Sequence, residues 1–272
     1  MNKINFIFWG TPDVASETLQ ILKQAGFLPS LIVTSPDAKS GRGLQMQASP
    51  VAIFAEKNNV PCLKPEKLDE EFTNRLKAIS YQLSIVVAYG KIIPENLINL
   101  PKLGSINIHY SLLPKYRGAS PVESAILNGD TETGVTIQQM KYKMDSGPII
   151  AQEKTEINPE EKTPNLRKRL IKIGAKLLIK VLPEIIENKI KLIEQNEEDA
   201  TYCKKIKKED GLIDLNDNGV KNYNKFRAYA TWPRTYFFEN GKRMIITDAI
   251  LENNLFVIKK VIPEGKKEIN YT

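Results

Sequence analysis

Residues 4–13 read Ile-Asn-Phe-Ile-Phe-Trp-Gly-Thr-Pro-Asp, and this stretch indicates the fold of the first part of the chain. The apolar run at residues 4–9 is typical of a strand that is buried on both faces in a parallel sheet. Gly10 permits a tight turn after the strand, Thr11 is expected to cap the next helix, and Pro12 suits the first helical position. The stretch therefore predicts a strand, a turn and a helix in direct succession.

The same succession of apolar strands and helical patterns continues along the chain. Further strands are predicted at residues 31–34, 83–88, 104–108, 135–140 and 149–153. Further helices are predicted at residues 49–58, 70–79 and 163–188. Because crossover helices cover both faces of a parallel sheet, the predicted fold class is α/β, with an open and mostly parallel Rossmann-like sheet.

The last quarter of the chain has a different pattern. After a polar stretch at residues 194–201, one helical pattern is followed by short alternating runs at residues 236–238, 244–250 and 255–262. Such runs predict a smaller β-rich domain. We expect Trp232 and Phe237 to pack in its core or between the domains, and not to stack on bases. The expected division is a first domain at residues 1–190, a linker at 191–205 and a second domain at 206–272.

The composition excludes several classes of protein. The chain has 272 residues, of which 42% are hydrophobic and 26% charged, as is typical of a folded globular protein. No apolar run reaches the roughly 18 to 20 residues that cross a bilayer, and no secretory pattern opens the sequence, so we expect a cytoplasmic protein that contacts no membrane. Cys62 and Cys203 lack the spacing of a zinc motif, and we expect no metal and no disulfide. We also expect a monomer.

His109 is the only histidine, and it directly follows the strand predicted at residues 104–108. Open α/β sheets bind ligands at the carboxyl ends of their strands. Asn107 lies two residues earlier, so both side chains are expected on one face of the strand. An amide can stabilise an oxyanion and an imidazole can move a proton near neutral pH, a combination that suits acyl transfer. The competing interpretation is structural, because buried histidines commonly satisfy a backbone hydrogen bond.

Three motifs around this histidine form a recognisable set. They are Ile-Asn-Ile-His at residues 106–109, Ser-Leu-Leu-Pro-Lys-Tyr-Arg-Gly at 111–118 and Met-Asp-Ser-Gly at 144–147. Together they resemble the signature of the 10-formyltetrahydrofolate-dependent formyltransferases. The resemblance implies a formyl transfer enzyme whose donor is 10-formyltetrahydrofolate. It also implies a catalytic set and a folate-binding loop, which here are Asn107, His109 and Asp145, and Ser111, Leu112, Leu113 and Pro114.

Motifs outside this site resemble one branch of the family, the methionyl-tRNA formyltransferases. They lie at residues 8–13, 35–37, 41–43, 87–90 and 134–137 in the first domain and at 205–214 and 232–233 in the second. The resemblance implies that the first domain is catalytic, that the second binds tRNA, and that the partner is initiator methionyl-tRNA. The family's C-terminal domain is a longer, barrel-like module, so a shortened barrel is expected here.

Basic side chains are candidates for the tRNA contact, because the net charge of +7 permits a polyanionic partner. Lys39 and Arg42 lie in the loop that, by the resemblance, enters the acceptor end of the tRNA. Lys204 and Lys205 begin a basic cluster at the domain junction. A stripe on the outer face of the long predicted helix consists of Lys168, Lys172, Lys176 and Lys180. This stripe is either solvated or neutralised by phosphates.

The implied reaction moves the formyl group to the α-amino group of methionine. A free α-amine titrates at about 7.7 to 8.0, so it can attack directly, and Asn107 would stabilise the oxyanion of the tetrahedral intermediate. Two proton routes stay open. Neutral His109 accepts the proton of the amine, or Asp145 keeps His109 protonated as an electrophile and relays the proton to the leaving nitrogen.

Other functions compete with this one. An amino sugar nucleotide formyltransferase would share the three catalytic residues but would not need the basic loop and the lysine clusters. A glycinamide ribonucleotide formyltransferase would want a phosphate cradle where this chain has Gly-Thr-Pro-Asp. An RNA-binding or folate-sensing module would not need the catalytic set. A dinucleotide-dependent dehydrogenase is excluded because no G-x-G-x-x-G follows the first strand.

Overall fold

The computed structural model describes residues 4–40 and 45–271 and contains two compact units. The first unit comprises the described residues up to Pro114 together with Val135–Glu153 and Leu170–Ala200. The second unit comprises Lys115–Gly134, Lys154–Arg169 and the described residues from Thr201 onward. The domain boundaries expected at residues 190 and 206 stay a prediction.

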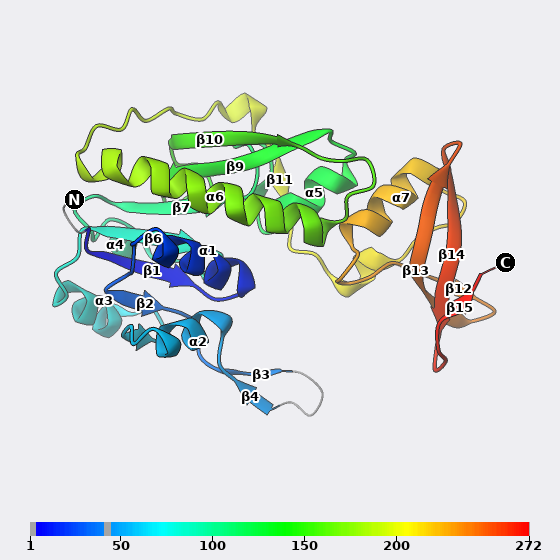
Figure 1. Ribbon diagram of the computed structural model, residues 1–272, viewed down its shortest axis with the longest axis horizontal. Helices are drawn as coiled ribbons and strands as arrows, with labels where there is room; N and C mark the ends of the chain where they lie inside the picture. Colours follow the sequence, from blue (N-terminus) through cyan, green and yellow to red (C-terminus); the bar gives the residue numbers. More distant parts are fainter. Residues whose placement is uncertain (1–3, 41–44, 272) are drawn as a thin grey trace. The chain divides into compact units, whose positions relative to one another are not determined.

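A seven-stranded sheet with the order β10-β9-β7-β6-β1-β2-β5 is the main element of the first unit (Figure 1). Its strands are β1 (Phe6–Gly10), β2 (Leu31–Val33), β5 (Cys62–Leu63), β6 (Leu83–Val87), β7 (Ser105–His109), β9 (Glu132–Gln139) and β10 (Ile149–Glu156). From β5 to β7 the neighbours are parallel, and β9 runs antiparallel to β7. The predicted open, mostly parallel Rossmann-like sheet is confirmed.

Helices cover this sheet, which explains why every residue of β1 and of β6 is buried. They are α1 (Asp13–Gln24), α2 (Pro50–Lys57), α3 (Glu70–Lys77), α4 (Glu95–Ile98) and α6 (Thr163–Ile186). A small antiparallel pair, β3 (Ala38–Ser40) and β4 (Gln45–Gln47), follows β2 in the chain. No helix in the part of the chain that the structure describes is long and apolar enough to cross a bilayer.

The start of α1 differs from the prediction. Its N-cap residue is Pro12, and no side chain caps it. The Thr11 hydroxyl instead donates to the backbone oxygen of Tyr89 at 2.9 Å. The predicted Thr11 cap is wrong because a loop 78 residues away offers the hydroxyl another acceptor. In α2, by contrast, Ser49 caps as its position before Pro50 favours, with its Oγ accepting from the Ala52 amide at 3.0 Å.

The long helix α6 presents its leucines to the interior, and the four lysines of the stripe are exposed. Gly174 lies on the buried side of this helix. A Cβ atom at Gly174 would lie 3.0 Å from Ile108 Cγ2 and 3.1 Å from Val135 Cγ1. Glycine therefore allows α6 to pack closely on β7 and β9, and any larger residue would require these side chains to shift by a few tenths of an ångström.

The second unit contains a four-stranded antiparallel sheet, as expected for a smaller β-rich domain. Its strands, in spatial order, are β12 (Tyr236–Glu239), β13 (Lys242–Glu252), β14 (Leu255–Pro263) and β15 (Ile269–Asn270). Further elements are α5 (Pro121–Leu127), α7 (Gly219–Ala228), the 3-10 turn Lys208–Gly211 and a parallel pair of β8 (Arg117–Gly118) with β11 (Tyr202–Cys203).

The two aromatic residues predicted to pack in this unit have different environments. Phe237 is buried in the core with Phe226 and Met244, as predicted. Trp232 is 54% exposed, so it does not pack in this core. It lies in the turn before β12, where the alternation of the strand no longer determines which side chains are covered.

Candidate active site

The carboxyl end of β7 brings together polar side chains from two strands. Asn107 pairs with Gln138 across the β7–β9 ladder, and His109, the last residue of β7, pairs with Thr136. Directly opposed residues of an antiparallel pair project from the same face of the sheet. These four side chains therefore share one face. Within residues 4–40 and 45–271, no group hydrogen-bonds the half-buried Asn107 carboxamide.

Asp145 approaches this face from the turn between β9 and β10. Its Oδ1 lies 3.6 Å from His109 Nδ1, and the two side chains are only 12% and 6% exposed. This separation is longer than a hydrogen bond but close enough for a carboxylate to orient and electrostatically stabilise an imidazole. Long contacts of this kind in a substrate-free site commonly shorten when the substrate binds.

The turn that carries Asp145 has an unusual backbone. Asp145 has a φ of 49°, in the left-handed region, which costs a non-glycine residue about 1–2 kcal/mol. Two residues later, a Cβ atom at Gly147 would collide with the backbone oxygen of Gln139. Only glycine therefore fits at position 147, where the chain passes β9. Other contacts therefore have to hold the turn in this conformation.

Two glutamine amides supply such contacts. Gln138 Nε2 donates to Asp145 Oδ1 at 2.8 Å, and Gln195 Nε2 donates to the backbone oxygens of Asp145 and Gly147 at 2.9 and 2.6 Å. Neither glutamine is among the residues predicted from the sequence. The sequence gives a weak indication for Gln138, which is a polar residue directly after the strand-like run 134–137. It gives no indication for Gln195, which lies in a polar stretch.

The loop at residues 111–114, the candidate folate contact, is fixed at its backbone. Thr136 Oγ1 donates to the Ser111 oxygen at 2.7 Å and accepts from the Leu113 amide at 3.0 Å. Gln152 Nε2 donates to the Leu113 oxygen at 2.8 Å. Ser111 and Leu113 are buried, whereas Leu112 and Pro114 are half-buried. The loop is thus ordered next to the residue that pairs with His109.

Those candidate tRNA contacts that the structure describes are exposed, unlike the candidate catalytic residues. Lys39 is exposed on β3, and Lys204 and Lys205 are exposed immediately after β11. Arg42 lies outside the described residues. None of the three described lysines makes an ion pair with a residue in 4–40 or 45–271, and their roles stay a prediction.

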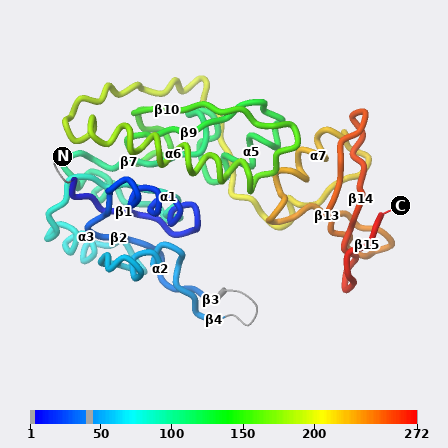
Figure 2. Tube along the Cα trace, in the orientation of Figure 1, coloured from blue at the N-terminus to red at the C-terminus, as the bar shows by residue number. Residues whose placement is uncertain are grey.

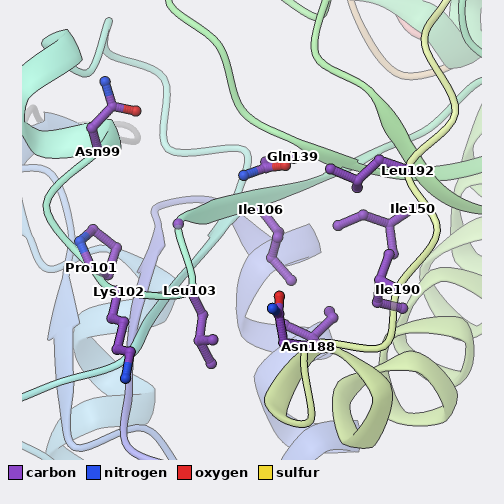
Figure 3. A pocket seen from close by; sticks show the side chains of 12 residues that line it. Asn99, Pro101, Lys102, Leu103, Ile106, Gln139, Ile150, Asn188, Ile190 and Leu192 are labelled. Atoms are coloured by element: carbon purple, nitrogen blue, oxygen red, sulfur yellow. The ribbon is translucent and has the colours of Figure 1, made fainter.

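A cavity of about 340 Å³ lies elsewhere in the first unit. Figure 3 shows Ile106 and Gln139 at its wall, with Ile150, Ile190 and Leu192 beside them. Ile106 and Gln139 alternate with Asn107 and Gln138, so their side chains project from the opposite face of the sheet. The cavity is therefore separate from the polar constellation.

Comparison with known proteins agrees with the fold. Residues 2–182 match the formyl transferase family, and residues 205–259 match the formyl transferase C-terminal domain. The protein is therefore a formyltransferase. In sequence, the chain is 39% identical over 266 residues to a methionyl-tRNA formyltransferase from Sulfurihydrogenibium sp., a match that covers 96% of this chain and 86% of that one. The chain belongs to the methionyl-tRNA formyltransferase family, which confirms the resemblance recognised in its motifs.

Solved structures show the same fold at lower identity. The methionyl-tRNA formyltransferase from Clostridium thermocellum has a TM-score of 0.64 at 16% identity and covers 98% of this chain and 100% of that one. An N-formyltransferase from Helicobacter canadensis, in complex with folinic acid and dTDP-3-aminofucose, has a TM-score of 0.71 at 22% identity and covers 98% of both chains.

Proposed function

We propose that this formyltransferase transfers the formyl group of 10-formyltetrahydrofolate to the α-amino group of initiator methionyl-tRNA, as a cytoplasmic monomer that acts in translation initiation. The observation that carries the proposal is the convergence of His109 and Asp145, at 3.6 Å, on the face of β7 that also bears Asn107. The family membership of the chain supports methionyl-tRNA as the acceptor.

The proposed reaction begins with direct attack of the neutral α-amine on the formyl carbon. A C–N bond forms, and negative charge develops on the formyl oxygen of the tetrahedral intermediate. The Asn107 carboxamide is the donor for this oxygen, since no described residue competes for it. The bond to N10 of the folate then breaks, and N10 takes up the proton that the amine has released. Atoms and charge balance without a covalent enzyme intermediate.

His109 is the proposed carrier of that proton. Its Nδ1 faces Asp145 at 3.6 Å, and we therefore assign the proton transfer to Nε2, the other ring nitrogen. The carboxylate fixes the plane of the ring and stabilises the imidazolium that forms when Nε2 accepts the proton. Both groups are nearly buried, so water screens their interaction weakly. Asp145 thus acts on the reaction chiefly through His109.

The remaining predicted residues are the proposed contacts with the two substrates. The backbone-fixed loop of Ser111, Leu112, Leu113 and Pro114 would contact the folate, because a rigid wall with half-buried apolar side chains suits a flat heterocycle. Lys39, Arg42, Lys204 and Lys205 would contact the tRNA backbone.

The test offers three acceptors separately to the purified enzyme with 10-formyltetrahydrofolate: initiator methionyl-tRNA, elongator methionyl-tRNA and a dTDP-amino sugar. We expect N-formylmethionyl product from the initiator tRNA, with a higher kcat/KM than from the elongator tRNA. Formylation of the sugar alone would replace the proposal by the amino sugar function. A full rate with His109→Ala would contradict the mechanism while leaving the acceptor assignment intact.

A further inference from the structure

Asp145 is held from two directions by amides of different segments. Gln138 reaches its carboxylate from β9, and Gln195 reaches its backbone oxygen from the chain that follows α6. The donors lie at 2.8 and 2.9 Å, within the range of good hydrogen bonds. Because the two contacts act on opposite ends of one residue, together they fix both where the Asp145 backbone passes and where its carboxylate points.

The segment around Gln195 is anchored next to this turn. Ile193 and Ile149 exchange two backbone hydrogen bonds, of 2.7 and 3.0 Å, at the start of β10. Figure 2 shows the chain returning past β10 after α6. Residues 193–195 therefore form a strap, in which the isoleucine bridge sets the register and Gln195 spans the carbonyls of Asp145 and Gly147.

Gln138 is buried at a cost to stability. The side chain is 2% exposed, and within residues 4–40 and 45–271 no donor reaches its Oε1, which is shielded from solvent. A buried acceptor without a partner is destabilising, so an apolar side chain of the same length would suit packing better. What the amide provides, and an apolar residue would not, is the hydrogen bond to Asp145.

We infer that Gln138 and Gln195 are positioning residues of the formyl transfer reaction, which keep Asp145 in its left-handed turn and its carboxylate beside His109. The inference rests on the role proposed above for Asp145. Neither glutamine touches the reacting atoms. Each acts through the 3.6 Å contact between Asp145 and the imidazole, because one amide holds the carboxylate of Asp145 and the other its backbone oxygen.

The single histidine gives a direct test that requires no substrate. A uniformly ¹³C-labelled sample has one imidazole Cε1–H signal, that of His109, whose chemical shift reports on the neighbouring carboxylate. The Asp145→Ala variant gives the chemical shift of His109 in the absence of this carboxylate. We expect Gln138→Met and Gln195→Met, which keep side-chain length and remove the donor, to move the signal part of the way toward the Asp145→Ala position.

The matched control is Glu194→Gln, one residue from Gln195. The Glu194 side chain is 73% exposed and pairs with Lys141 at 3.2 Å, an ion pair of little energetic value. This variant should keep the wild-type signal. Gln195→Glu, which replaces the donor by a carboxylate facing two carbonyl oxygens, should displace the signal at least as far as Gln195→Met. It also keeps the test open if Gln138→Met does not fold.

Kinetics provide the second readout. With both substrates saturating, Gln195→Met should lower kcat about tenfold and leave both KM values nearly unchanged, as expected when a catalytic group is slightly misplaced. A wild-type histidine signal and kcat in folded Gln138→Met and Gln195→Met would overturn the inference, as would an Asp145→Ala signal equal to that of the wild type. If the wild-type enzyme fails to formylate methionyl-tRNA, the proposed function fails, and the signal still decides the positioning.

Discussion

Two groups of polar residues differ sharply in their surroundings. His109 and Asp145 are almost fully buried, and the Asp145 turn is fixed by hydrogen bonds of 2.8, 2.9 and 2.6 Å. Lys39, Lys204 and Lys205 are exposed. Chemistry on one carbon requires fixed geometry and weak screening, whereas attraction of a polyanion requires only accessible charge. Substitutions in the two groups should therefore change different kinetic constants.

The largest effect is expected from His109→Ala. Removal of the proton carrier should lower kcat by about 10²- to 10⁴-fold, because general acid–base catalysis supplies a factor of that size. The measurement is a single-turnover rate at saturating substrates, with circular dichroism to establish that the variant is folded. The deficit should persist at high salt, since the contact with Asp145 is buried. A near-normal rate in the folded variant would remove His109 from the mechanism.

A smaller effect, on folate binding, is expected from Thr136→Val. The substitution keeps the shape and removes the hydroxyl that bridges the Ser111 oxygen and the Leu113 amide. Each buried group left without a partner costs about 1–3 kcal/mol, so the loop should loosen and the KM for 10-formyltetrahydrofolate should rise about tenfold.

The matched control for the loop is Thr18→Val, at another fully buried threonine. Its hydroxyl donates to the Val14 oxygen within α1 at 2.8 Å, so the substitution also removes a buried hydrogen bond. It should lower stability without changing the KM for the folate. Equal KM values for Thr136→Val and Thr18→Val would show that the Thr136 hydroxyl does not support donor binding through the loop.

The smallest effect is expected from the double variant Lys204→Glu and Lys205→Glu. The KM for methionyl-tRNA should rise several-fold and depend less steeply on salt, by roughly 0.7 to 0.9 in logarithmic slope for each phosphate that the protein no longer neutralises. The KM for the folate should not change. The control carries the same charge reversal at Lys67 and Lys77, two other exposed lysines. If the control raises the tRNA KM equally, overall charge and not a local interaction explains the effect.

The sequence predicts the centre of the first unit well because its central strands, β1 and β6, are buried on both faces. Continuous apolar runs predict β6 to within one residue and β1 to within two at each end. The period of two predicts that Asn107 and His109 share one face of their strand, and both pair with polar residues of β9 there. Both features depend on local geometry, which is why neighbouring residues are sufficient to predict them.

The contacts that hold the site could not be predicted, because they join residues far apart in the sequence. Gln195 is 50 positions from Asp145 in the sequence. Thr11 donates to Tyr89, 78 positions away, and for this reason does not cap α1 as expected. The left-handed φ of Asp145 could not be predicted either, because aspartate adopts this conformation more often than most residues but still only rarely. Trp232 shows the same limit for burial at the end of a strand.

Gly174 lies behind the sheet, on the face opposite to the candidate catalytic side chains. The helix backbone packs closely on Ile108, whose two chain neighbours are Asn107 and His109, so an added side chain at position 174 would push on the strand that carries both residues. The helix thus lies directly behind β7. Inactivating changes can consequently arise at a residue that no ligand ever touches, on a surface turned away from the chemistry.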